Sequence, residues 1–152
     1  MKLIILKNHL VESLSSLERS VSENPNLPIL KNFLIKTESN KILFSATNLE
    51  IAVTSTVSGK IIENGETTIP FYITNNIVKN LVAERVSLEL KNNKFIINTE
   101  NYEALLQNQG AKDFPIIPDV KNKNNFFEID VETLKEGLGN TIIATQYSEI
   151  RP

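Results

Sequence analysis

The sequence is poor in the residues that most often carry catalysis or covalent cross-links. Its 152 residues include no cysteine, no tryptophan and one histidine. The lack of cysteine excludes disulfides, thiolate zinc sites, iron–sulfur clusters and a cysteine nucleophile. The single histidine, His9, excludes a serine–histidine pair away from the start of the chain. None of the three aspartates, Asp113, Asp119 and Asp130, is placed as one of a carboxylate pair for two-metal or acid–base chemistry. These absences disfavour an enzyme.

The chain also lacks an excess of either charge and any long hydrophobic run. Its 16 basic and 18 acidic side chains give a formal net charge of −2. Modules that hold nucleic acid by charge alone usually carry a basic surplus, so the balance argues against that class. The apolar start, residues 1–6, has only the length of a strand, too short for a signal peptide or a membrane span. We therefore expect a cytoplasmic globular protein with no membrane partner.

The apolar pattern predicts a first unit of strand, helix and three strands within residues 1–58. Residues 2–6 are typical of a strand, and leucines spaced three or four apart after Asn8 predict an amphipathic helix. Proline excludes helical geometry at the residue before it, so Pro25 and Pro28 end the helix. Three strand-like runs follow, at residues 29–37, 41–46 and 51–58.

The same order recurs over residues 66–107, which indicates an internal duplication. Residues 67–72 are predicted as a strand, and Thr74 as the N-cap of a second helix. Three alternating strands complete the unit. When the two helices are aligned by their apolar residues, Leu10 corresponds to Ile77 and Leu14 to Leu81.

A third unit begins and stops. Residues 126–129 are predicted as a strand, Asp130 as an N-cap and the following residues as a helix. Such a strand and helix cannot bury their apolar stripe alone. We therefore expect a first domain at residues 1–118, a linker at 119–125 and the truncated start of a second domain at 126–152.

Two features near the first helix can be interpreted either as functional or as ordinary parts of the surface. His9 and Glu12 have a spacing that suits a metal, but without a third ligand nearby an exposed helix start is favoured, and no metal or cofactor is predicted. A polar face turns away from the leucines and is either plainly solvated or suited to slide past DNA. It contains Ser15, Ser16, Arg19, Ser20 and Ser22.

Several loop segments resemble those of one family. Residues 24–33 resemble the RPTLPILxN segment of the bacterial DNA polymerase III beta subunit, the sliding clamp. Residues 46–50 are similar to its TATDLE, residues 111–115 to its AxDFP and residues 144–152 to its AASTDETRP. These segments occur in the family's order along the whole chain.

The resemblance implies an α+β clamp fold in which duplicated strand–helix–three-strand units place antiparallel sheets outside and two helices on the inner face. It implies a non-catalytic processivity factor, in which two subunits pair head to tail and encircle duplex DNA without reading bases. It also implies that polymerase and clamp loader bind regions absent from this chain. The alternative is a stand-alone clamp-like module that pairs with or blocks a full-length clamp.

The resemblance also implies site residues, residue by residue. Candidates for facing DNA are Asn24, Lys79, Arg19 and Lys135, and the three cations could equally be solvated surface charges. The family carries a basic residue where Asn24 stands, so a phosphate contact there would be neutral and weaker. Candidates for the subunit contact are Ile77, Leu81, Ala104 and Leu106, whose other possible role is core packing. Asn101 and Glu103 stand where some members carry basic residues, which changes the charge of that contact.

Overall fold

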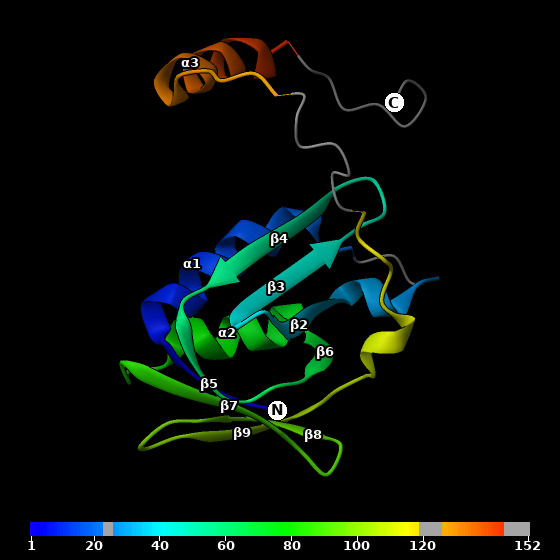
Figure 1. The fold of residues 1–152 in the computed structure, drawn as a ribbon, viewed down its shortest axis with the longest axis vertical. Coiled ribbons are helices and arrows are strands. Elements are labelled where there is room, and N and C mark those ends of the chain that lie inside the picture. The colour runs from blue at the N-terminus through cyan, green and yellow to red at the C-terminus, as the bar shows by residue number, and fades with distance from the viewer. Residues whose placement is uncertain (23–25, 119–125, 145–152) are drawn as a thin grey trace. The chain divides into compact units, whose positions relative to one another are not determined.

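The computed structural model describes residues 1–22, 26–118 and 126–144. The chain divides into two compact units, residues 1–117 and 118–152, and each is described here by itself (Figure 1).

The first unit contains two antiparallel sheets and two helices, which confirms the predicted α+β class. One sheet has the order β5–β1–β7–β8–β9, made by Gly59–Glu63, Lys2–Leu6, Arg85–Lys91, Lys94–Asn98 and Glu103–Gln107. The other has the order β4–β3–β2–β6, made by Ala52–Val57, Lys41–Thr47, Asn32–Glu38 and Glu66–Pro70. The helices are α1, Lys7–Leu17, and α2, Phe71–Asn80. In Figure 1, α1 lies behind β3 and β4, which it contacts, and it also packs against α2.

The two repeats exchange their first strands. β1 pairs with β5 and β7, so the first strand of the chain lies in the sheet of the second repeat. β6 pairs with β2 and so lies in the sheet of the first repeat. Each sheet therefore needs residues from both halves of the chain.

The core joins both repeats through buried aromatic rings. Phe33 and Phe44 come from the first repeat, Phe71 from the second, and each is at most 1% exposed. The ring centroids of Phe33 lie 5.3 Å from Phe44 and 6.0 Å from Phe71, within the range of favourable aromatic pairs. The core thus holds the exchanged halves together.

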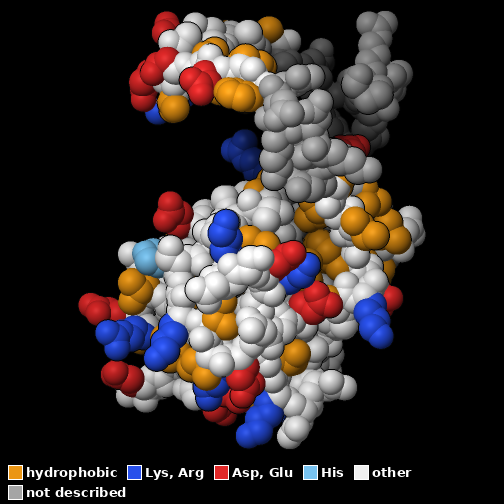
Figure 2. Space-filling model, in the orientation of Figure 1, with side chains coloured by type: hydrophobic (Ala, Val, Ile, Leu, Met, Phe, Trp, Pro, Cys, Tyr) orange, Lys and Arg blue, Asp and Glu red, His pale blue; other side chains and the backbone are white. Residues whose placement is uncertain are grey.

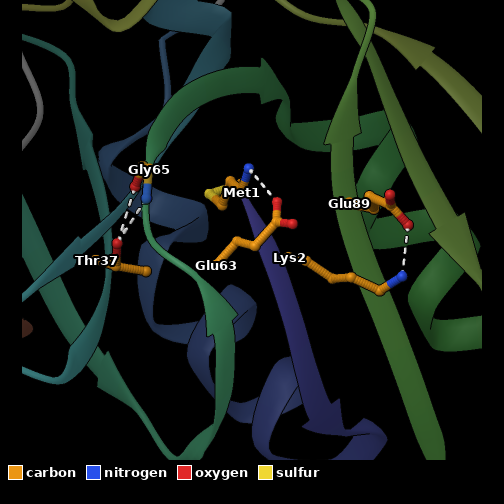
Figure 3. Close-up of polar contacts among 6 residues, drawn as sticks. All are labelled: Met1, Lys2, Thr37, Glu63, Gly65 and Glu89. Carbon is orange, nitrogen blue, oxygen red and sulfur yellow. Dashed lines mark hydrogen bonds and ion pairs between the residues drawn. The ribbon is translucent and has the colours of Figure 1, made fainter.

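The start of the chain is held by polar contacts to both neighbouring strands (Figure 3). The amino group of Met1 lies 3.5 Å from Glu63 Oε2 on β5, and Lys2 Nζ lies 3.0 Å from Glu89 Oε2 on β7. In the other sheet, next to the pairing of β2 with β6, the Gly65 N–H donates to Thr37 Oγ1 at 2.8 Å. The contact from Met1 reaches β5, a strand that the sequence pattern did not predict.

Two predicted boundaries in the second repeat are wrong. The strand ends at Pro70 and α2 begins at Phe71, so Thr74 is not an N-cap but lies inside the helix. Its hydroxyl donates to Pro70 O at 2.7 Å and is buried. The residue before a helix can be proline because its missing N–H is not needed there.

The predicted alignment of the two helices is also wrong by almost one turn. β1 and β6 have equal lengths and lead directly into α1 and α2, so Lys7 corresponds to Phe71. Leu14 then corresponds to Val78 rather than to Leu81, and both are buried. Leu81 is buried as well, so the boundaries of strands and helices, rather than burial or the spacing of leucines, fix the alignment of the repeats.

Local corrections apply to two further segments. Residues 28–31 form a short 3-10 helix ahead of β2 instead of the start of a strand. Ser20, expected on the polar face, is buried, and its hydroxyl donates to Leu17 O at 2.8 Å.

The second unit contains α3, Val131–Ile142. Its predicted N-cap is confirmed, because Asp130 Oδ2 accepts from the Thr133 N–H at 3.1 Å. The strand predicted at residues 126–129 does not form. The predicted linker at 119–125 lies outside the described residues.

Candidate functional surfaces

The exposed side of the helices carries few charges, and their signs balance. Arg19 follows α1 and Lys79 lies in the last turn of α2, and both are exposed. Glu12 and Glu18 are exposed beside them. Lys79 Nζ lies 3.9 Å from Glu18 Oε2, with the side chains 44% and 48% exposed. This surface is therefore polar without being strongly basic.

A further lysine of the helix layer, Lys7, makes a hydrogen bond within the fold. Lys7 Nζ donates to Leu81 O, the carbonyl that follows α2, while the Lys7 N–H donates to Glu84 O at 2.8 Å. A cation at a helix C-terminus interacts favourably with its carbonyls. The sequence pattern did not show this role because the partner lies 74 positions away.

One open edge of the first unit is β9. β9 pairs with β8 and is the last strand of its sheet. Beside it, a groove of about 680 Å³ lies between the end of α2 and residues 99–102. Its apolar lining includes Ile77, Leu81 and Tyr102, with Glu100 among its polar residues.

The four candidate residues for the subunit contact lie near the β9 edge, but their side chains differ in solvent exposure. Leu81 is 6% exposed and belongs to the core, whereas Ile77, Ala104 and Leu106 are half-buried and pack against it. Leu105, which sequence reasoning did not single out, points away from them and is 57% exposed. Strand alternation provides the signal for Leu105, because neighbouring residues of a strand point to opposite faces.

A second open edge is formed by β4, the last strand of the other sheet. Just before it, Leu49 and Ile51 are 59% and 54% exposed. β4 and β9 close the first and second repeats in the same way, so the two open edges are equivalent positions of the duplication.

The remaining candidates fall elsewhere. Asn24 lies outside the described residues, and Lys135 is exposed on α3 in the second unit. On the face drawn in Figure 2, basic and acidic side chains of the first unit are interspersed rather than gathered by sign.

His9 and Glu12 lie near each other on α1 without forming a metal centre. His9 Nδ1 lies 3.2 Å from Ser58 O, so this nitrogen carries the proton and donates to the carbonyl. In the described parts of the chain, no three potential ligands among His, Asp and Glu gather into a site that could hold a metal ion. No helix in those parts is long and apolar enough to cross a membrane.

Comparison with known proteins identifies the family. The sequence model of the family described as "DNA polymerase III beta subunit, N-terminal domain" matches residues 1–118. The chain belongs to this family. The predicted resemblance is thereby confirmed, and the chain is a DNA polymerase III beta-subunit homologue.

Its relatives carry the name beta sliding clamp. The chain is 33% identical over 155 residues to the protein from Buchnera aphidicola, covering 99% of this chain and 42% of the relative. It is 29% identical over 151 residues to a sequence from Vibrio harveyi, covering 97% of this chain and all of the relative.

Solved structures of the family share the fold. The sliding clamp from Bacillus subtilis is 26% identical, has a TM-score of 0.91 and is matched over 100% of this chain and 42% of its own. A protein from Eubacterium rectale, described as a putative DNA polymerase III beta subunit, is 28% identical with a TM-score of 0.88, matched over 94% and 39%. The chain thus spans about two fifths of the length of these two solved proteins.

Proposed function

We propose that the chain is the N-terminal part of a bacterial sliding clamp, a ring that encircles duplex DNA and tethers the replicative polymerase. The proposal rests on one observation above all. In a family-matched fold, α1 and α2 pack side by side with polar outer surfaces whose charges nearly cancel. Such a surface suits a protein that holds DNA by enclosure, because tight binding by charge alone needs many basic residues on phosphates.

In this proposal, the helices face the DNA. Lys79 and Arg19, both exposed, contact phosphates and carry no sequence information. Lys135 on α3 and Asn24 are proposed to contribute in the same way, Asn24 through a neutral hydrogen bond. The protein acts without catalysis, in the cytoplasm, where it would meet replicating DNA.

The β9 edge is the proposed contact with a second subunit. Its unpaired backbone groups can extend a sheet into a partner, as open edge strands do. Ile77 and Leu81 supply apolar surface at the groove, while Ala104 and Leu106 on β9 pack against the core. Polymerase and clamp loader are proposed to bind parts of the ring outside this chain.

The same open edge supports a second candidate, a stand-alone module that pairs with or blocks a complete clamp. The groove beside β9 is available to the complementary edge of another clamp subunit. Native mass spectrometry of this chain mixed with a complete clamp distinguishes the two, since a stable heterodimer favours the blocking module.

The ring itself is tested by topology. The complete product of the gene should remain on nicked circular plasmid after gel filtration and be lost when one restriction cut makes the plasmid linear. The 152-residue chain alone should bind short linear duplex weakly, with affinity falling as salt rises. Tight, salt-insensitive binding of linear duplex by this chain contradicts the proposal.

A further inference from the structure

The candidate DNA contact Lys79 has two acidic neighbours from the other helical segments. Glu18, in the short 3-10 helix after α1, lies with its Oε2 3.9 Å from Lys79 Nζ. Glu12, on α1, lines a shallow hollow of about 430 Å³ together with Lys79 and Lys7. Lys7 keeps its positive charge there, but its Nζ is held by the hydrogen bond that it donates to Leu81 O.

The Glu18–Lys79 pair is loose. Its distance is at the outer limit for an ion pair, and both side chains are close to half exposed. Pairs of this kind contribute little to stability, so its loss leaves the fold intact. Its effect on a third charge is different, because any phosphate that approaches Lys79 also approaches Glu18.

We propose that Glu18 is an acidic attenuator of Lys79, which competes with DNA phosphates for this lysine and keeps the helix surface from gripping the duplex. The inference rests on the proposed function, since it concerns the same DNA-facing surface. At about 4 Å, two unit charges in water interact by about 1 kcal/mol, which corresponds to about fivefold in an equilibrium constant. Salt screening reduces this, with a Debye length of about 10 Å at 0.1 M.

The attenuation would serve sliding. A ring that holds DNA by enclosure needs contacts that form and break as the duplex moves. Lys79 remains available to a passing phosphate, while Glu18 re-forms the pair when the phosphate leaves. In this view, the balance of charge on the helix surface comes from the position of Glu18 beside Lys79, rather than from a shortage of basic residues.

The test compares Glu18→Gln with a matched control, Glu38→Gln. Both substitutions remove one negative charge from a Lys–Glu pair. In the control pair, Lys36 Nζ lies 2.9 Å from Glu38 Oε2 on β2, away from the helices. The hydrogen bond from Lys36 and the charge of Glu38 raise the pKa of Lys36 above its ordinary value.

Binding is measured by chemical-shift titration of the 152-residue chain with a short mixed-sequence duplex. At 0.1 M salt, Glu18→Gln is expected to tighten binding about threefold. The slope of log affinity against log salt becomes steeper by up to about 0.9, the value for one added phosphate contact. The Glu38→Gln variant should stay close to the original chain, and adding Lys79→Ala to Glu18→Gln should remove the gain.

The outcomes separate the inference from the proposed function. Equal gains in Glu18→Gln and Glu38→Gln, or no gain in either, overturn the attenuator, even when the shifted amides lie on α1 and α2. Shifts confined to residues far from both helices overturn the proposed DNA-facing surface itself. A gain that survives the added Lys79→Ala substitution also overturns the attenuator, because Glu18 then acts on some other group.

Discussion

At the scale of single residues, Gly59 shows how closely β5 approaches its neighbour β1. It stands where the chain leaves β4 and enters β5. A Cβ at this position would lie 2.8 Å from Ile5 Cγ1 and 2.9 Å from the backbone oxygen of Ile4. The backbone oxygen cannot move without disturbing β1, so glycine is required here by space.

We expect Gly59→Ala to lower the free energy of unfolding by about 1–3 kcal/mol, the usual cost of overpacking a tight site. Gly110→Ala is the matched control, because no atom lies within 4 Å of a Cβ there. Urea denaturation followed by circular dichroism measures both. Equal stability of the two variants would show that β1 and β5 separate easily at this point.

At the scale of elements, the helices differ in how they are supported. α1 and α2 each bury four residues against the sheets and each other. α3 has an N-cap and an apolar stripe but buries no side chain, with Leu138 59% exposed. Isolated helices of about 12 residues are marginal in water, because helix nucleation is costly.

We therefore expect amide hydrogens of α3 to exchange much faster than those of the central strands β1 and β7. Hydrogen exchange measured residue by residue tests this on the intact chain. Substituting Asp130 with Ala should speed exchange in α3 further, since the N-cap contributes about 1 kcal/mol. Protection of α3 equal to that of β7 would mean that tertiary packing supports this helix.

At the scale of the whole molecule, the exchange of first strands makes the duplicated domain one folding unit. β1 finds its partners at residues 59–63 and 85–91, and β6 finds its partner at residues 32–38. Neither repeat alone has a complete sheet. The duplication is therefore visible in the order of the elements, but the two repeats are not independent folding units.

We expect the separate pieces 1–64 and 65–118 to be unfolded alone and to fold when expressed together, because each sheet needs strands from both. Proton–nitrogen correlation spectra of each piece and of the mixture provide the measurement. A well-dispersed spectrum from either piece alone would contradict the reciprocal pairing of β1 and β6.

The local features that the sequence predicted are those decided by neighbouring residues. Local residue types also account for the turns at Ser39-Asn40 and Asn92-Asn93, which have positive φ at every position, a geometry that asparagine tolerates well. Asp130 caps α3 through its own side chain. One error arose where distant residues decide, because β5 forms on an edge offered by β1, more than fifty positions away. The error at Thr74 was local, because Pro70 ends β6 directly before α2 and leaves Thr74 inside the helix.

For the candidate surfaces too, some properties follow from the sequence and others only from the tertiary structure. Composition and spacing by themselves determined the duplicated order of elements, the absence of a cysteine site and the near-neutral charge, because these depend on residue types and short periods. Only the tertiary structure decided which strands exchange, that Lys7 serves Leu81, and that Glu18 stands beside Lys79. The two side-chain contacts join residues more than sixty positions apart, and packing of the complete core, rather than any local pattern, brings them together.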